Sequence, residues 1–227
     1  MKKQFKIIPD YMFLPLFLAI ICNTVTYYGT RFVTSGWVHY NLSNGLDDII
    51  PFVPWTVAIY LGCYLFWAAN YILGCRQDER STIRFISADF LAKLVCLVIF
   101  LVFPTTNIRP LVTGNSFWET VMLWLYDADP ADNLFPSIHC LTSWFCFIAV
   151  RENPKVPGWY KVVSLLLAAA VCMSTLTTKQ HVLLDVAGGI ALAEGSYWFV
   201  RKSGFARRYA GCLQTINKKA DHGGRKA

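Results

Sequence analysis

The sequence has few charged residues for its length and only four histidines. Of its 227 residues, 15% are charged and 55% are hydrophobic, which leaves too little polar sequence to cover a soluble globule of this size. The eight cysteines form no Cys-x-x-Cys pair, so they are interpreted as small apolar fillers. Internal repeats and low-complexity runs are also absent. These features predict an integral membrane protein.

Six apolar stretches are long enough, or nearly so, to cross about 30 Å of hydrocarbon as helices. They cover residues 11–29, 52–74, 86–104, 137–150, 161–178 and 182–200. Strand-like alternation is absent from them, and only helices or closed barrels satisfy the backbone polar groups in lipid. The expected fold is therefore all-α, a single membrane-embedded bundle of six transmembrane helices over residues 1–227. Lys2, Lys3 and Lys6 precede the first stretch, which lacks a small-x-small cleavage site and is expected to remain as an anchor.

The basic residues predict how the chain lies in the membrane. Seventeen Lys and Arg residues fall in the N-terminal segment, the second and fourth connections and the basic tail 201–227, against Arg31, Arg109 and Lys179 on the other side. By the positive-inside rule both termini are cytoplasmic, with the plasma membrane of a bacterium as the expected location. Attraction to anionic headgroups explains the basic tail more simply than a nucleic-acid partner, and none is expected.

His181 and Asp185 lie four residues apart beside an apolar segment, where ionisable groups are costly and usually functional. On a helix they share one face, so the carboxylate can hold the imidazole tautomer and leave the other ring nitrogen free as a nucleophile or base. The structural alternative is a satisfied polar pair at the membrane interface. The predicted topology places this pair, and the acidic loop containing Asp127, Asp129 and Asp132, away from the cytoplasm.

His139 follows Pro136 and Ser137 at the expected outer end of the fourth helix. Free backbone N–H groups and the positive end of the helix dipole form an anion site there. Pro136 suits the first helical turn, and Ser137 adds a hydroxyl donor. Arg109 and Lys179 are expected at the same membrane face and supply cations for a phosphoryl group, although either one alone could merely snorkel to the interface. Together these residues predict a phosphate-handling site.

Two of these stretches resemble motifs of the type 2 phosphatidic acid phosphatase and vanadium haloperoxidase superfamily. Its second motif, Pro-Ser-Gly-His, is matched by residues 136–139, with Ile in place of Gly. Its third motif, Ser-Arg-x5-His-x3-Asp, keeps its spacing through Ser174, His181 and Asp185, but Thr175 occupies the Arg position.

The first motif, Lys-x6-Arg-Pro, keeps Arg109 and Pro110 but has Val102 in the Lys position. Lys179 is a candidate replacement for one lost cation, whereas Lys93 is expected to pair with Asp89 inside the third helix. The motif sequences Phe-Pro-Ser-Ile-His and Thr-Lys-Gln-His-x3-Asp resemble those of the branch that contains inositol phosphorylceramide synthases.

The resemblance implies a mechanism. His181 would be the nucleophile that takes the phosphoryl group, Asp185 would orient it, and His139 would protonate the leaving oxygen. The phosphate oxygens would be held by Arg109, Ser137, Lys179 and Ser174. Neither a metal nor another cofactor is then required. A metal-dependent hydrolase with His139, His181 and Asp185 as ligands, and a non-catalytic transporter or scaffold, stay open as alternatives.

The expected function is a membrane lipid-phosphate phosphatase acting on phosphatidate, a polyprenyl pyrophosphate or a related lipid, with water as the acceptor. The alternative is a lipid phosphotransferase that moves a headgroup phosphate to an alcohol. Gly188, Gly189 and Gly195 are expected to allow close helix packing.

Overall fold

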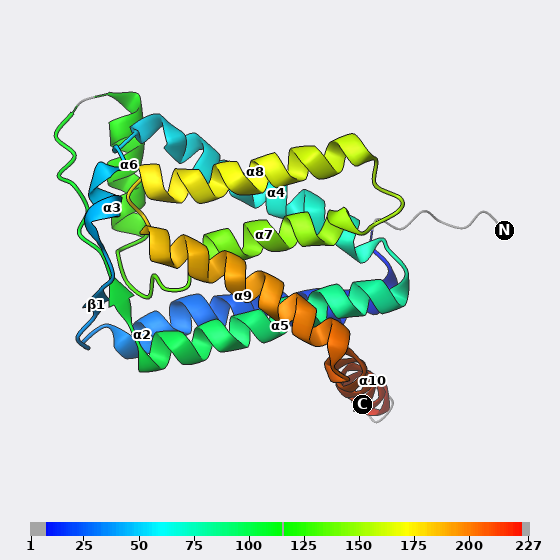
Figure 1. Cartoon of the computed structure of the whole chain (residues 1–227). Helices are drawn as coiled ribbons and strands as arrows, with labels where there is room; N and C mark the ends of the chain where they lie inside the picture. Colours follow the sequence, from blue (N-terminus) through cyan, green and yellow to red (C-terminus); the bar gives the residue numbers. More distant parts are fainter. Residues whose placement is uncertain (1–7, 115, 224–227) are drawn as a thin grey trace.

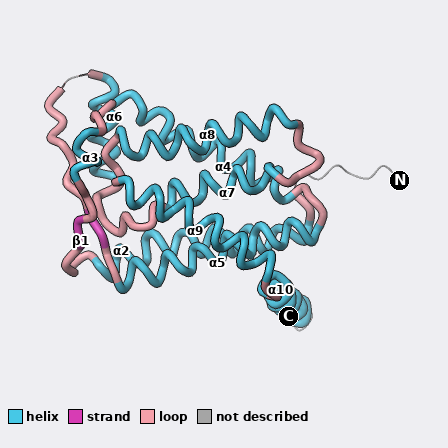
Figure 2. Tube along the Cα trace, viewed as in Figure 1, coloured by secondary structure: helices cyan, strands magenta, loops and turns pink. Residues whose placement is uncertain are grey.

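The computed structural model describes residues 8–114 and 116–223. These residues form a bundle of long helices joined by shorter helical turns and one pair of very short strands (Figures 1 and 2). In chain order the elements are η1 (Asp10–Met12), α1 (Phe13–Thr24), η2 (Val25–Gly29), α2 (Thr30–Thr34), β1 (Tyr40–Asn41), α3 (Gly45–Ile49), η3 (Pro54–Thr56), α4 (Val57–Cys75), α5 (Glu79–Val102), β2 (Thr105–Thr106), α6 (Phe117–Ala128), α7 (Ile138–Arg151), α8 (Gly158–Thr177), α9 (Leu183–Lys202) and α10 (Phe205–Gly223).

All six predicted stretches are largely helical, which supports an all-helical membrane protein. In the described part of the chain, four helical stretches are long and apolar enough to cross a membrane, namely Phe13–Thr34, Pro54–Cys75, Glu79–Val102 and Gly158–Thr177. α7 has 14 residues, and α9 carries Asp185 and Glu194 within its 20 residues. By length and composition, the predicted count of six spanning helices is therefore not confirmed.

Two helix boundaries differ from the prediction for identifiable reasons. α5 begins at Glu79 because the Asp78 side chain accepts a hydrogen bond from the Ser81 N–H at 3.0 Å and caps the helix. The prediction began at residue 86 because Arg80 and Arg84 break the apolar pattern. The first helical stretch continues to Thr34 through the π-helical turn η2, where the prediction ended at residue 29.

The loops divide between two ends of the bundle. The connections α4–α5 and α7–α8 lie with α10 on the right of Figure 1, whereas α2, β1, α3 and α6 lie on the left. We call these the basic end and the site end. Lys2, Lys3 and Lys6, and Arg225 and Lys226 of the tail, lie outside the described residues. At the site end, β1 pairs in parallel with β2. This pairing joins the segment after α2 to the segment after α5.

α7 is the central helix, packed against α4, α5, α8 and α9. Its buried side chains Leu141, Phe145 and Ile148 join Phe85 of α5 in the main hydrophobic core. The helix begins at Ile138, with Ser137 as its N-cap, so Pro136 lies before the helix and not in its first turn as predicted. Because α9 also packs on α7, the core fixes both elements that carry the predicted catalytic residues.

Gly189 lets α9 approach the start of α7 closely, as predicted. A Cβ at this position would lie 2.6 Å from the Ser137 carbonyl oxygen, and one at Gly188 would meet the Phe135 ring. Gly195 differs from the prediction, because a Cβ there would have no neighbour within 4 Å.

Gly189→Ala is expected to lower the free energy of unfolding by about 1–3 kcal/mol, since the clash is with rigid backbone. Gly195→Ala is the matched control on the same helix, and it should be neutral or slightly stabilising. Thermal unfolding in detergent measures both. An unchanged midpoint for Gly189→Ala would show that the two helices separate without cost.

Candidate active site

The two predicted catalytic histidines come together at the site end. His139 lies in the first turn of α7 and His181 in the α8–α9 connection. Their ring centroids are 6.2 Å apart, with the ring planes inclined by 54°. Both side chains are buried, at 9% and 8% exposure. Two residues 42 positions apart in the sequence therefore share one cleft.

Asp185 holds His181 in place. Its Oδ2 lies 3.2 Å from His181 Nδ1 and accepts the Val182 N–H at 3.0 Å. The Asp185 carbonyl oxygen accepts the Ser137 N–H at 3.0 Å, which ties the start of α9 to the start of α7. Burial lowers the pKa of His181, but the hydrogen bond and charge of Asp185 outweigh it, so this pKa is raised. With Nδ1 engaged, Nε2 is the nitrogen available for attack.

A second acid supports His139 through a tyrosine. Tyr60 donates its hydroxyl proton to Asp129 Oδ2 at 3.1 Å, and its oxygen lies 3.3 Å from His139 Nδ1. Because that proton is already used, the Tyr60 oxygen accepts from His139 Nδ1–H. Tyr27 also donates to Asp129. His139 Nε2 is buried without a hydrogen-bond partner in the described residues, so it is the nitrogen free to exchange a proton with a substrate.

Sequence reasoning missed Tyr60 and Tyr27, because neither belongs to a motif. Asp129 was expected only as part of an acidic loop on this face. The network joins residues that are 69 to 102 positions apart, so it becomes visible only where η2, α4 and the end of α6 meet beside His139.

The sequence also matches a known protein family. A family model described as the PAP2 superfamily matches residues 37–199, most of the chain. The chain belongs to the PAP2 superfamily. PAP2 proteins are phosphoric-ester hydrolases or transferases, so membership indicates a phosphatase-type enzyme. No curated protein matches the sequence significantly.

The two PAP2 motif positions that lack their basic residue have different surroundings. Val102, in the Lys position, is 73% exposed at the end of α5. Thr175, in the Arg position, is fully buried, and its carbonyl oxygen accepts the N–H groups of Gln180 and His181 at 3.0 and 3.1 Å. Neither position supplies a cation. Lys93 bonds Asp89 at 2.9 Å, which confirms the predicted pair.

The predicted phosphate-binding cations lie beside the cleft and not inside it. Arg109 donates to the Gln180 side chain and, at 3.4 Å, to the Tyr126 carbonyl oxygen. Its burial lowers its pKa, but an arginine remains cationic. Lys179 donates to the Asp47 carbonyl oxygen at 2.8 Å and lines a small cavity that also touches His181.

The two predicted serines also differ from each other. Ser137 caps α7 by accepting the Cys140 N–H at 3.3 Å, and its side chain is fully buried. Ser174 donates to the Val171 carbonyl oxygen within α8 at 2.7 Å, so its proton is engaged. Gln180, which was not predicted, lines the cleft between the histidines, and its Nε2 has no partner in the described residues. Its Nε2 is therefore a hydrogen-bond donor that the described residues leave unused at the cleft.

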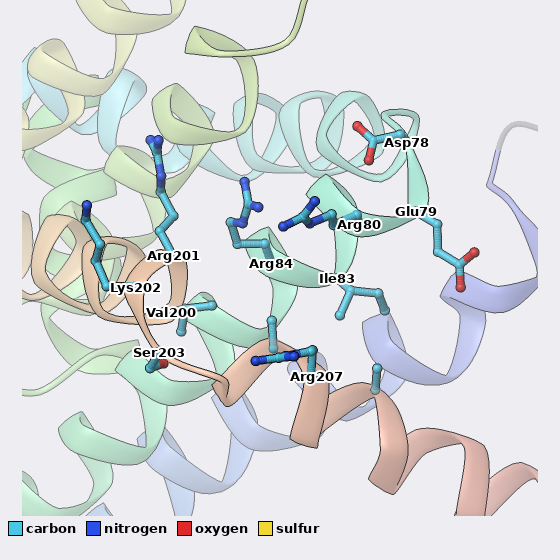
Figure 3. Close-up of a pocket in the computed structure, with 12 residues that line it drawn as sticks. Asp78, Glu79, Arg80, Ile83, Arg84, Val200, Arg201, Lys202, Ser203 and Arg207 are labelled. Atoms are coloured by element: carbon cyan, nitrogen blue, oxygen red, sulfur yellow. The ribbon is translucent and has the colours of Figure 1, made fainter.

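Three cavities are relevant to where a substrate binds. The cleft between the histidines has a volume of about 20 Å³, room for about one water molecule. A larger cavity of about 380 Å³ opens from His139 between aromatic side chains of α4, α6 and η2. A third cavity, of about 890 Å³, lies at the basic end among Arg80, Arg84, Arg201, Lys202 and Arg207 (Figure 3). Neither histidine lines it, so this cavity is separate from the cleft.

The described residues contain no group of three His, Cys, Asp or Glu side chains placed to hold a metal ion. Asp185 Oδ2 already serves His181 and the Val182 N–H.

Asp185→Asn is expected to reduce kcat by roughly 10²–10⁴-fold, because the imidazole tautomer is no longer held. It should also move the acid limb of the pH–rate profile to lower pH. The reason is that attack requires unprotonated Nε2, and Asp185 is what raises the pKa of His181. Steady-state rates across the pH range give both values. An acid limb that does not move would contradict this role of Asp185.

Tyr60→Phe is expected to slow the turnover of a lipid phosphate by about 10–100-fold, since a hydrogen bond to a charged group contributes about 1.5–3 kcal/mol. The ring stacks on His139 with centroids 4.4 Å apart, and phenylalanine retains that contact. Tyr64→Phe is the control, because the Tyr64 ring also contacts His139 but its hydroxyl bonds no described residue. Equal rates for the two variants would remove Tyr60 from the support of His139.

Proposed function

We propose that this PAP2 protein is a membrane lipid-phosphate phosphatase that works through a phosphohistidine on His181. The observation that carries this proposal is the facing pair of histidines, each supported at Nδ1 by an acid. Asp185 bonds His181 directly, and Asp129 supports His139 through Tyr60. In this proposal His181 is the nucleophile and His139 the proton donor, and both line one cleft.

The reaction has two steps. His139 enters the first step as the imidazolium, protonated at both ring nitrogens. His181 Nε2 attacks the phosphorus, the bond to the lipid oxygen breaks, and His139 gives its Nε2 proton to that oxygen while its Nδ1–H stays bonded to Tyr60. Water then attacks the phosphohistidine, His139 takes the proton from the water, and the phosphorus–nitrogen bond breaks. Splitting one displacement into two lowers each barrier. In this proposal Gln180 donates to the phosphate oxygens from the wall of the cleft, Ser137 does so from the start of α7, and Arg109 and Lys179 contribute positive charge from the edges.

The lengths of the helices support a site recessed within the membrane. The 14 residues of α7 span about 21 Å, less than the hydrocarbon thickness of about 30 Å. We propose that the basic end, with both termini, faces the cytoplasm of a bacterial cell and that the site opens on the other side. A lipid would reach His139 through the aromatic cavity without leaving the bilayer.

A lipid phosphotransferase is the second candidate, similar to the inositol phosphorylceramide synthases. The cleft favours it in one respect. Asp129, Asp132 and Asn133 line the cleft and provide oxygens that accept hydrogen bonds from hydroxyl groups. The two PAP2 cation positions are meanwhile occupied by Val102 and Thr175. An alcohol would then replace water in the second step and give its proton to His139.

The test uses purified protein in detergent with a chelator, labelled lipid phosphates and candidate alcohols. Free phosphate and new phosphodiester are measured for the wild type and for His181→Ala. His181-dependent phosphate release without an alcohol supports the phosphatase. Product that requires an alcohol supports the transferase, and loss of activity with the chelator would instead indicate a metal enzyme. Absence of His181-dependent product from every lipid would overturn both proposals.

A further inference from the structure

A second cavity lies beside the aromatic one and opens where the side chains of Ile20, Thr24 and Ala68 are exposed. It has a volume of about 260 Å³ and lies among side chains of α1, α4, α5 and α7. Asn23 and Trp67 line both cavities. The two cavities are therefore neighbours, with His139 of α7 lining the first and Thr142 of α7 lining the second. We call this second cavity the inner pocket.

Most of the wall of the inner pocket is apolar, but polar side chains also line it, among them Thr142, Asn23 and Lys93. Thr142 is 5% exposed, and its hydroxyl has no hydrogen-bond partner in the described part of the chain. The Asn23 side chain is partly exposed and also lines the pocket, and its amide bonds none of the described residues. Unpaired polar groups inside a membrane are costly, and they commonly mark the path of a substrate. The pocket thus offers hydrogen bonds that the protein itself does not use.

The third polar side chain limits the charge of the ligand. Lys93 is 2.9 Å from Asp89, which also accepts the Tyr71 hydroxyl at 2.8 Å. The lysine charge is therefore already balanced, while its ammonium group has further N–H donors. This combination suits a neutral oxygen acceptor better than a second phosphate.

The distance from His139 to the inner pocket matches the distance from the phosphate of a lipid to the groups next to that phosphate. Thr142 follows His139 by three residues on α7 and so lies on the same helix face, about 5 Å further along the axis. If the phosphate of a lipid occupies the cleft, the lipid atoms beside Thr142 are only a few bonds away from the phosphorus. In glycerolipids and sphingolipids those atoms include ester or amide carbonyls, whereas in polyprenyl phosphates they are hydrocarbon.

We infer that the substrate is a lipid phosphate that carries an ester or amide carbonyl near its phosphate, and that Thr142 and Asn23 recognise this carbonyl. Thr142 is then a specificity residue one helical turn below the proton donor. The inference rests on the proposed function for the placement of the phosphate. Its evidence, the unpaired polar groups of the inner pocket, is separate from the catalytic residues.

The experiment compares kcat/KM for phosphatidate, its dialkyl ether analogue without carbonyls, an N-acyl sphingoid phosphate and a polyprenyl phosphate. The wild type should prefer the ester or the amide over the ether analogue by about 10–100-fold. Thr142→Val, which has the same shape without the hydroxyl, should bring the ratio of carbonyl to ether lipid close to one. Thr142→Ser should restore the ratio and show that the fold is intact. The ester and amide arms identify which carbonyl the pocket takes.

A binding measurement on inactive protein tests this inference independently of the proposed function. Inactive His181→Ala protein is titrated with the ester and ether lipids, alone and with Thr142→Val. An ester preference that disappears with Thr142→Val supports the inner pocket even if no lipid is hydrolysed. Equal use and equal binding of ester and ether lipids by protein with Thr142, or a preference for the polyprenyl phosphate, would overturn the inference.

Discussion

His181→Ala should reduce turnover of a lipid phosphate by roughly 10⁴–10⁶-fold, because the variant loses the atom that forms the covalent intermediate. Brief incubation of the wild type with a labelled lipid phosphate, followed by quenching at high pH, should leave label on His181 and none on the variant. His39→Ala is the matched control. His39 lies in an outer loop, where its Nδ1 is 3.0 Å from the Trp37 carbonyl oxygen, and its removal should leave turnover unchanged.

Near-normal turnover by His181→Ala would contradict the mechanism, as would label on a different residue. The circular dichroism spectrum and the elution volume in detergent establish that the variant is folded. His181→Gln provides a second check, because it keeps a hydrogen-bonding side chain beside Asp185 but has no nucleophilic nitrogen.

His139→Ala should slow lipid phosphate turnover by about 10²–10⁴-fold, since the leaving alkoxide no longer receives a proton. The loss should be much smaller with an aryl phosphate, because its phenolate leaving group departs without protonation. The ratio of the two losses is the informative quantity, and a variant that is simply misfolded would lose both activities equally.

His139→Gln tests the same residue with less disturbance of the packing. His139 stacks on Tyr60 and lies 5.5 Å, centroid to centroid, from the Trp67 ring, and glutamine fills more of that space than alanine. Equal losses on the lipid and aryl substrates in both variants would assign His139 a structural role in place of a catalytic one.

The helices and the two histidines could be predicted because their signals are local. Hydrophobic runs located the long helices, and motif spacing located His139, His181 and Asp185. The count of spanning helices was less predictable, because α7 and α9 lie among other helices and need not meet the length or hydropathy of an isolated span. α9 in particular accommodates Glu194, which bonds Arg151 and the Trp144 indole from α7.

Individual phosphate ligands were harder to predict than the histidines. Ser174 occupies a motif position, yet its hydroxyl bonds a carbonyl of its own helix, a local alternative open to any serine in a helix. Gln180 has no motif position, yet its amide lines the cleft. Motif spacing identifies which residues come near the site, but side-chain direction depends on which hydrogen bonds the backbone satisfies first.

The π-helical turn Val25–Gly29 has a consequence for insertions and deletions in this chain. A π turn accommodates one residue more than the α-helix around it, so the flanking segments keep their facing directions. Deletion of one residue within the turn should leave α1 and α2 oriented as they are, whereas the same deletion in the middle of α4 would rotate the rest of that helix by about 100°. What the shortened turn would lose is the position of Tyr27 and its bond to Asp129. At the turn Val25–Gly29 the helical stretch can therefore lose one residue and keep its fold, but the hydrogen bond from Tyr27 to Asp129 at the site is lost.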